Sequence, residues 1–477
     1  MSQRYSKDPR VDRSLRHSVK DGVSYSVMTG AGESYFAAFA LHLKASTAQI
    51  GVLASLPPLL ASFAQLFSSW LGRRWGKRKH IIVLGATLQG IALLPLGLLP
   101  VLFPQHAIPI LVVCAVVYFA GANLAVPQWG SLMGDLVPER RRGRYFARRT
   151  RLCSVASFTG LLCAGVVLDL FDRHAWTVAG YLVIFGIAVF ARLVSVYHLW
   201  QMHDPPGHVA ALESPFGLGF WRRVRGSSFV HFSAFFAATS FAVSICSPFF
   251  VVYQLRDLQF SYLEYTVSIA VVVLAQFLTL NRWGRISDAF GNRFILVATG
   301  SIIPFLPALW LVSTNYLYIL LLQALGGLVW AGFSLSAGNY LYDLIPGNKR
   351  AMYLAFHNVL ASIAVFCGAM SGAYLGTHLP RETELFGTHY EWLSVLYGVF
   401  LTSALVRLLV AAVFLPRLKD MRATRPASVG GVIFRVARLQ PLSELIFDII
   451  SPRRRRKASP PAIPDRQKDA DSSRGPA

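Results

Sequence analysis

The sequence predicts an all-α polytopic membrane protein with twelve transmembrane helices arranged in two six-helix bundles. Three observations support this fold class. Hydrophobic residues make up 54% of the 477-residue chain and charged residues only 14%, against roughly 25% charged in soluble domains. Twelve apolar segments are long enough to cross a bilayer, which takes about 20 mainly apolar residues per helix. A polar stretch rich in proline divides the twelve into six and six.

The apolar segments follow one another with short polar connections. They fall near residues 22–42, 46–71, 81–103, 107–133, 152–171, 176–199, 227–254, 261–281, 294–313, 315–342, 352–378 and 391–416. We expect helices, because every backbone polar group inside lipid must be satisfied within its own segment. The chain then divides into a cytoplasmic N-terminal segment (1–21), an N-terminal bundle (22–199), a central cytoplasmic loop (200–226), a C-terminal bundle (227–416) and a basic, largely disordered cytoplasmic tail (417–477).

The basic residues orient these segments. Lys and Arg total 46 against 23 Asp and Glu, a net charge of +23 that by itself suggests a nucleic-acid partner. With the N-terminus inside, 40 of the 46 basic residues fall on the cytoplasmic side and four in outer loops. This is the positive-inside pattern of an integral plasma membrane protein, as in a bacterial inner membrane, with both termini cytoplasmic. We therefore predict no nucleic-acid partner.

The two halves of the chain resemble each other in sequence. The matching pairs share offsets of 215 or 208 residues and are Gly76/Gly291, Arg78/Arg293, Gly85/Gly300, Arg192/Arg407, Asp135/Asp343 and Arg142/Arg350. A duplicated six-helix unit with parallel repeats is typical of secondary transporters. Arg192 and Arg407 lie within spans, and we expect their side chains to extend to the cytoplasmic surface.

The tail and the cysteines suggest no cofactor chemistry. Residues 442–450 can form a short amphipathic helix, and the basic run 451–457 follows it. This run is either a solvated orientation signal or a contact with anionic lipid. The five cysteines lie inside apolar segments and none forms a CxxC motif, so we predict no metal site, no disulfide framework and no cofactor.

A repeated motif lies between spans 8 and 9. It reads Gly284-Arg-Ile-Ser-Asp288-Ala-Phe-Gly291-Asn-Arg293, and residues 69–78 between spans 2 and 3 keep its basic end, Gly76-Lys77-Arg78. This pattern resembles the cytoplasmic signature of the major facilitator superfamily over residues 20–416. The first copy departs from the signature, since Ser69 stands for the first glycine and Arg73 for the aspartate.

The resemblance implies that these loops gate the cytoplasmic side. Gating residues implied in this way are Gly76, Lys77, Arg78, Asp135, Arg142, Gly284, Asp288, Gly291, Arg293, Asp343 and Arg350. The resemblance implies that Asp288 forms a latch that holds the halves together in the outward-facing state. Its partner would be the start of span 5, around Arg142. A carboxylate there accepts hydrogen bonds from exposed amides at a helix N-terminus and suits its dipole. The alternative is that the basic residues serve only to orient the chain.

Glu33 is an acidic residue near the middle of span 1, beside Gly30 and Gly32. A charge at the bilayer centre costs at least ~2.5 kcal/mol, so an ionisable residue there usually faces a cavity and has a function. We interpret Glu33 as a carboxyl for proton coupling or for binding a cationic substrate. The alternative is a structural carboxyl hydrogen-bonded between packed helices.

Other polar side chains complete the predicted cavity, which the family resemblance places between spans 1, 4, 7 and 10. These are Tyr35, Asn123, Gln128, Trp129, Thr239, Ser240, Trp330, Ser334 and Asn339. For each, the alternative is ordinary hydrogen bonding between membrane helices.

No enzyme motif accompanies this pattern. The chain has no GxxxxGK[ST], HExxH or GxSxG sequence, which argues against an ATP-driven pump, a zinc protease or a serine hydrolase. We predict a monomeric secondary active transporter that moves a small-molecule substrate across the lipid bilayer by alternating access. Glu33 would allow this transport to be coupled to protons. The rival is a non-transporting sensor or membrane assembly partner built on the same fold.

Overall fold

A computed structural model describes residues 8–138, 141–205, 226–345, 350–380, 382–385 and 388–419. Within these ranges eleven helices are long and apolar enough to cross a membrane, in agreement with the predicted all-α membrane fold. The first predicted span is not among the eleven. Its helix has a polar first half and breaks at Glu33, so no long apolar window forms. The C-terminal tail with its basic run lies outside the described residues.

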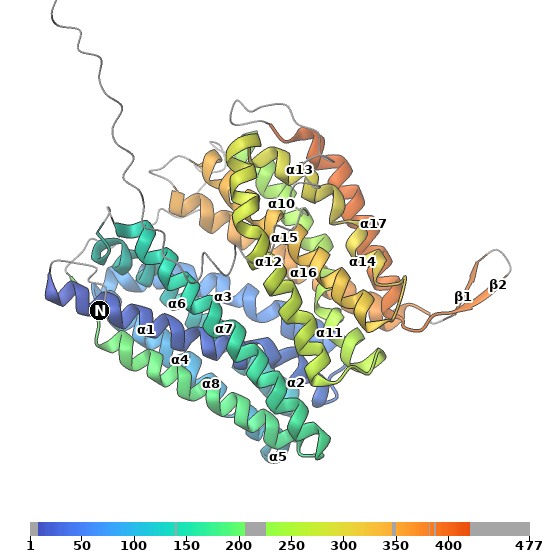
Figure 1. Cartoon of the computed structure of the whole chain (residues 1–477), viewed down its shortest axis with the longest axis horizontal. Coiled ribbons are helices and arrows are strands. Elements are labelled where there is room, and N and C mark those ends of the chain that lie inside the picture. The colour runs from blue at the N-terminus through green and yellow to red at the C-terminus, as the bar shows by residue number, and fades with distance from the viewer. Residues whose placement is uncertain are drawn as a thin grey trace, which may run out of the picture. The chain divides into compact units, whose positions relative to one another are not determined.

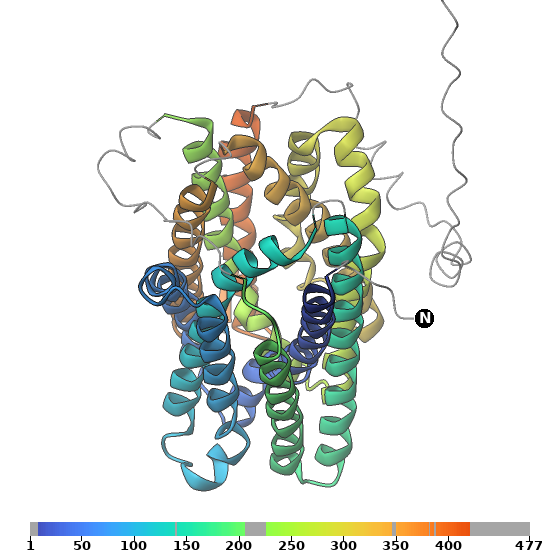
Figure 2. The ribbon, with the colours of Figure 1, turned by 90° about the vertical axis from the view of Figure 1, so that its left-hand side faces the viewer.

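In the N-terminal half, the helices are mostly long and single. They are α1 (Pro9–Ala31) with η1 (Glu33–Tyr35) and α2 (Phe36–His42), α3 (Thr47–Trp75), α4 (Arg78–Leu93) with η2 (Leu96–Leu98) and α5 (Leu99–Leu102), α6 (Ala107–Leu136), α7 (Arg142–Arg173) and α8 (Thr177–Trp200). Helix α1 packs along α7 and α8, and α6 packs along both α3 and α4 (Figures 1 and 2). Helix α1 begins at Pro9, well before the predicted start of span 1 near residue 22.

The C-terminal half repeats this plan with more breaks. Its elements are α10 (Ser228–Ser244), η4 (Ser247–Phe249), α11 (Phe250–Val252), η5 (Tyr253–Asp257), α12 (Tyr262–Phe290), α13 (Asn292–Ile302), α14 (Phe305–Leu309), α15 (Tyr316–Leu344), α16 (Arg350–His378), α17 (Leu396–Phe414) and η7 (Leu415–Arg417). A hairpin that the sequence patterns do not predict, β1 (Glu382–Leu385) paired antiparallel with β2 (Thr388–Glu391), connects α16 to α17.

Helices α3 and α12 have equivalent sequence signals at their first and last residues. Ser46 and Gln49 form a capping box at the start of α3, and Ser261 and Glu264 form one at the start of α12. In each box the serine side chain accepts from the third helical amide, while the Gln or Glu side chain accepts from the serine amide. Both serines and both partners differ by 215 residues, the offset of the sequence repeat.

Both helices also end at a glycine with positive φ, Gly76 at 62° and Gly291 at 83°. Glycine adopts this conformation without steric cost, so the chain can reverse there within one or two residues. The turns are consequently much shorter than the predicted gating loops. Residues 69–75 belong to α3 and residues 284–290 to α12, so most of the signature is helical.

Glycines let two helices of the N-terminal half approach closely. A Cβ at Gly85 of α4 would lie 2.4 Å from the Gly121 carbonyl oxygen of α6, and one at Gly121 would lie 2.6 Å from the Gly85 oxygen. Neither position has room for a larger residue. Close backbone approach at small residues is the usual way that helices associate in lipid.

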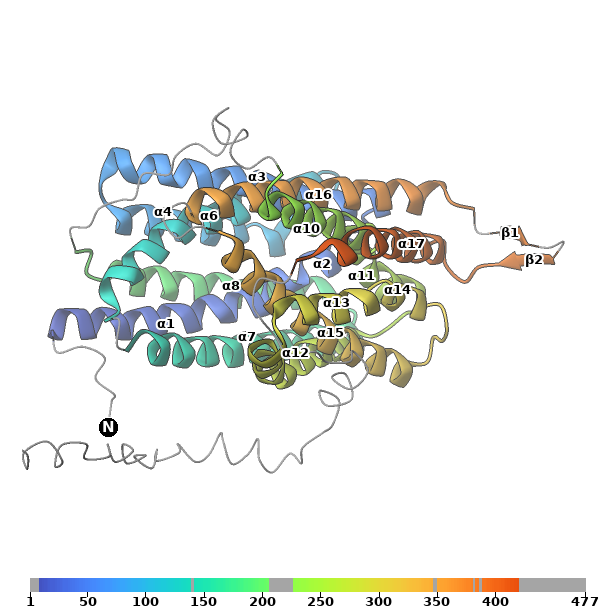
Figure 3. The ribbon, with the colours of Figure 1, turned by 90° about the horizontal axis from the view of Figure 1, so that it is seen from above.

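The two halves meet at the end of the helices opposite the Lys/Arg-rich turns. We call the end with residues 76–80, 141–144 and 291–293 the basic end, and the other the opposite end. Helix α3 lies along α16, and α7 along α12 (Figure 3). The Tyr35 hydroxyl donates to the Leu161 carbonyl at 2.7 Å and lies 2.9 Å from the Thr266 hydroxyl across the halves.

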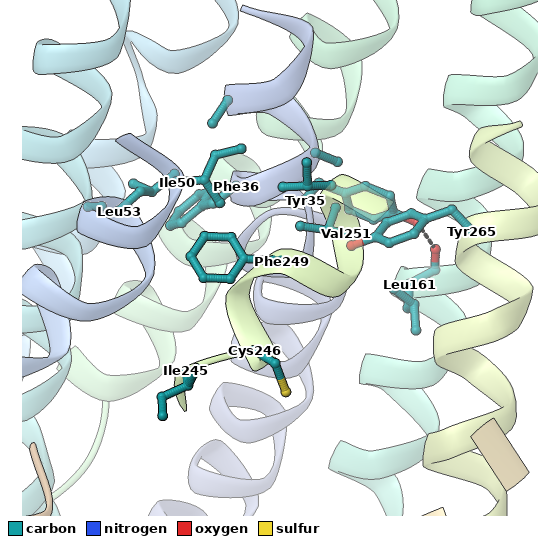
Figure 4. Close-up of a cluster of buried hydrophobic side chains, with 14 of the residues drawn as sticks. Tyr35, Phe36, Ile50, Leu53, Leu161, Ile245, Cys246, Phe249, Val251 and Tyr265 are labelled. Carbon is teal, nitrogen blue, oxygen red and sulfur yellow. Dashed lines mark hydrogen bonds between the residues drawn. The ribbon is translucent and has the colours of Figure 1, made fainter. Parts of the chain in front are cut away.

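Apolar side chains fill the rest of this junction. Phe36, Ile50 and Leu53 of the N-terminal half lie beside Phe249 of the C-terminal half (Figure 4), and Ile245 belongs to the same apolar cluster. All five are buried. A second polar contact across the halves joins Arg256 to the Thr47 hydroxyl at 3.5 Å. The halves are therefore joined firmly at the opposite end.

Candidate functional site

At the basic end, the buried Arg78 organises a cluster of charges. It is only 2% exposed and starts α4 directly after the Gly76 turn. Its guanidinium donates to Asp135 of α6 at 2.6 Å and lies 3.4 Å from Asp204, beyond the end of α8. It also donates to the Pro205 carbonyl at 2.9 Å. The cluster ties three helices together at the place where the signature predicts gating residues.

The C-terminal half makes a similar connection at the equivalent carboxylate. Asn292, at the start of α13, donates to Asp343 near the end of α15 at 3.2 Å. Asp343 is the repeat partner of Asp135, whereas Asn292 stands at the position equivalent to Lys77. Arg293 instead donates to the Leu418 carbonyl at 2.7 Å. Asn292 departs from the basic residue of the family signature, and it donates to Asp343 through a neutral amide.

The predicted latch is not formed in this structure. Asp288 is exposed and makes no hydrogen bond or ion pair with the described part of the chain. Arg142 donates to the Gly134 carbonyl of its own half at 2.9 Å. Gly284 has open space around it, and the side chain of Arg350 lies outside the described residues. Lys77 is exposed and forms the N-cap position of α4.

Glu33 lies where the first helix breaks in the middle of the N-terminal half. The break turns its half-buried carboxylate toward α6, where it accepts a hydrogen bond from the Tyr118 hydroxyl at 2.8 Å. Tyr118 is fully buried, so it holds one carboxylate oxygen in place. This is a hydrogen-bonded carboxyl with one clear partner, and the geometry is compatible with either interpretation of Glu33.

Four of the predicted cavity residues line one cavity of about 370 Å³ in the C-terminal half, which we call the Trp330 cavity. The four are Thr239, Ser240, Trp330 and Ser334. Helix α16 adds His357 and Asn358, which sequence reasoning does not select because they carry no motif. His357 is buried, and its Nδ1 lies 3.1 Å from the Ser233 hydroxyl of α10.

The remaining predicted cavity residues are spread over other surroundings. Tyr35 is fully buried in the junction between the halves. Gln128 is buried and donates to the Ser68 carbonyl of α3 at 2.8 Å, a contact between neighbouring helices. Asn123 donates to the Phe119 carbonyl one turn back, at 3.1 Å. Asn339 is exposed on α15.

Trp129 belongs to a different cavity, within the N-terminal half. This cavity has a volume of about 200 Å³ and contains Arg192, and we call it the Arg192 cavity. The prediction that Arg192 and Arg407 extend to the cytoplasmic surface is wrong, since they are only 3% and 5% exposed. Each finds acceptors inside its own half, so neither side chain needs to reach water.

The acceptors of the two arginines differ. Arg192 donates to the Ser195 hydroxyl at 2.7 Å, to the Ala86 carbonyl at 3.2 Å and to the Gln89 side-chain oxygen. Arg407 donates to the carbonyls of Ile303 and Val243, each at 3.3 Å, and to the Cys246 sulfur at 3.0 Å. Pro307 lacks an amide that could bond to Ile303, which leaves that carbonyl free for Arg407.

A duplicated bundle of membrane helices with interior cavities is typical of the class of membrane transporters. A family model described as Major Facilitator Superfamily matches residues 23–280 and 232–456. The chain therefore belongs to the major facilitator superfamily, whose members are transporters and not enzymes.

Comparison with a curated protein gives a short match. The chain is 27% identical over 145 residues to the tetracycline resistance protein, class C, of Escherichia coli. The match covers 29% of this chain and 35% of that protein, so it spans about a third of the relative.

Solved structures match over nearly their whole length. The nucleoside transporter NupG has a TM-score of 0.64 at 12% identity, covering 85% of this chain and 99% of that one. A bacterial homologue of the iron transporter ferroportin has a TM-score of 0.65 at 13% identity, covering 86% and 99%. A D-xylose-proton symporter has a TM-score of 0.64 at 14% identity, covering 87% and 99%. At these identities the likeness shows the fold alone.

Proposed function

We propose that this protein is a secondary active transporter that moves a small solute by alternating access, coupled to proton movement through Glu33. The observation that carries the proposal is the position of the Glu33 carboxyl, half-buried at a helix break and held by Tyr118 at 2.8 Å. An ionisable group at this depth can exchange a proton as access changes from one side to the other. The Trp330 cavity supplies mixed polar and aromatic walls for a solute.

We further propose that the basic end faces the cytoplasm, in a bacterial inner membrane, with both chain termini on that side. The support is the concentration of Lys and Arg at this end. Since the halves meet at the opposite end, the described conformation then corresponds to an inward-facing state. The transporter works as a monomer in this proposal, and the basic tail contacts anionic lipid.

We propose only that the solute is a small molecule, and we assign it to no chemical class. The relatives named above are a tetracycline resistance protein, a nucleoside transporter, a homologue of an iron transporter and a D-xylose-proton symporter, and these names share no chemistry that would select one solute for this chain. A thermal-shift screen of a panel of small molecules on the purified protein would identify solutes that bind.

Transport in reconstituted vesicles separates a transporter from a sensor. A solute that stabilises the protein should accumulate when a pH gradient is imposed, and accumulation should stop when an ionophore collapses the gradient. Binding of the solute with no movement above that of empty vesicles would contradict the proposal and favour the rival, a sensor on the same fold.

The latch at Asp288 is a further part of this proposal. The exposed Asp288 would bind the start of α7 only in the outward-facing state, so Asp288→Asn should favour the inward-facing state. A cysteine at Ser334 should then react several-fold faster with a bulky maleimide added to inside-out vesicles. The background needs serine at the exposed native Cys163 and Cys367.

Arg285→Gln, an exposed neighbour on the same helix, is the matched control and should leave the labelling rate unchanged. Equal labelling rates in Asp288→Asn and the unaltered background would remove Asp288 from the gating mechanism.

A further inference from the structure

We propose that the Arg192 cavity binds a small oxyanion, either a free carboxylate or phosphate ion or such a group on a larger solute. The cavity lies inside the N-terminal half, between α1, α4, α6, α7 and α8, and does not include Glu33 or the residues of the Trp330 cavity. The inference does not depend on proton coupling, because it rests on the charges and donors of this one site.

The cavity wall carries more positive than negative charge. Asp21 is 4% exposed and is the one carboxylate of the lining, whereas Arg149 and Arg192 are both cationic. Arg149 lies 3.5 Å from Asp21, and the Ser195 hydroxyl donates to Asp21 at 2.7 Å while accepting from Arg192. The single carboxylate is thus shared between two guanidinium groups, which leaves an excess of one positive charge, with Arg192 buried and Arg149 partly exposed. A buried charge of this kind is stabilised by a counter-ion.

Two further donors on the wall have no acceptor among the described residues. Gln89 is fully buried, and its side-chain oxygen already accepts from Arg192. Its Nε2 group therefore points away from Arg192 and has no hydrogen-bond partner. The Trp129 Nε1 group also has no hydrogen-bond partner. Reversing the Gln89 amide would place its NH₂ group against a guanidinium, so the orientation is fixed by chemistry. Unpaired buried donors are rare and call for an acceptor.

The volume of the Arg192 cavity and the residues that line it limit the ligand to one anionic group. The volume of about 200 Å³ can hold an acetate or a phosphate ion. The rings of Trp129 and Tyr25 cover the two guanidinium groups, at 4.4 Å from Arg149 and 5.1 Å from Arg192. Apolar residues complete the lining, which strengthens the attraction of the charges for an anion.

The test is an isosteric charge change inside the cavity. Gln89→Glu keeps an acceptor for Arg192, replaces the unpaired donor by a second oxygen and cancels the excess charge. We expect this variant to melt at a higher temperature than the wild type in buffer without small oxyanions. Gln128→Glu is the matched control, since Gln128 is equally buried but its amide donates to Ser68, and this variant should melt at a lower temperature.

Anion titration supplies the second measurement. Acetate and phosphate are added to the purified protein at constant ionic strength and at a constant HEPES concentration. Binding to the folded state alone should raise the wild-type melting temperature progressively, by several degrees at saturation, and should leave Gln89→Glu unchanged. A shift with both ions shows recognition of a free oxyanion. A shift only with larger carboxylates or phosphate esters from a solute panel shows recognition of a group on a solute.

Two results would overturn the proposal. The first is destabilisation by Gln89→Glu to the same degree as by Gln128→Glu, which would show that the cavity does not favour negative charge. The second is an equal anion-dependent shift in wild type and Gln89→Glu, which would be a general salt effect. Both readouts are made in detergent without transport, so they stay separate from failure of the proposed proton coupling.

Discussion

Replacing Glu33 by glutamine should abolish solute accumulation driven by a pH gradient, with a loss of at least about 100-fold, as for removal of a proton-transferring group. The amide has the shape of the carboxyl and can still accept from Tyr118, but it cannot release a proton. Uptake of the solute found by the binding screen, measured in reconstituted vesicles with an imposed gradient, gives the result. Exchange of solute at equal pH on both sides should persist.

Two control variants separate the carboxyl from its surroundings. Tyr118→Phe removes the hydrogen bond at 2.8 Å but keeps the carboxyl, so accumulation should survive with a changed pH dependence. Glu264→Gln changes the capping box of α12, far from Glu33 in the sequence, and should leave coupling intact. Full accumulation in Glu33→Gln at every pH tested would show that Glu33 is a structural carboxyl.

Asp21→Asn should lower the free energy of unfolding by about 3–5 kcal/mol, the usual cost of removing one partner from a buried charge pair. The substitution preserves shape and leaves Arg149 and Arg192 close together without a carboxylate. The apparent melting temperature of the purified protein, or its resistance to denaturant, measures the loss.

Asp169 provides the comparison, because it is also buried but pairs with Arg173, which is 66% exposed, at 2.7 Å one turn away. Surface-exposed pairs of this spacing contribute about 0.3–0.5 kcal/mol, so Asp169→Asn should cost much less. Adding Gln89→Glu to Asp21→Asn returns a carboxylate to the Arg192 cavity and should recover stability. Equal losses in the Asp21 and Asp169 variants would show that the cluster has no special electrostatic role.

The fold can be predicted because its signals are strong and local. Apolar segment length specifies the membrane helices, and the 215-residue offset predicts the duplication. The same offset recurs in the capping boxes at Ser46 and Ser261, a local signal that could have placed the starts of α3 and α12. The hairpin at residues 382–391 escapes prediction, because short strands outside the apolar segments have no comparable pattern.

The site is harder to predict, because its residues act through partners distant in the chain. The sequence places Asp21 in a polar N-terminal segment, since its surroundings are rich in charge. In the structure α1 extends back to Pro9, and Ser195, 174 residues away, donates to Asp21. Arg192 is expected from sequence to reach water, because no local pattern shows that the Ser195 hydroxyl and acceptors on α4 surround it. Only tertiary packing determines which buried charges have partners.

The junction of the halves at one end of the helices has a mechanical consequence. A helix as long as α3, with 29 residues, measures about 44 Å at 1.5 Å per residue. In alternating access the halves part at the opposite end as they close at the basic end, so a tilt of about 10° about the helix midpoint displaces each tip by about 4 Å. The contact between Tyr35 and Thr266 crosses the halves at the opposite end, so it must break in the outward-facing state. Exposing the buried apolar side chains of the junction is therefore a free-energy cost of reaching the outward-facing state.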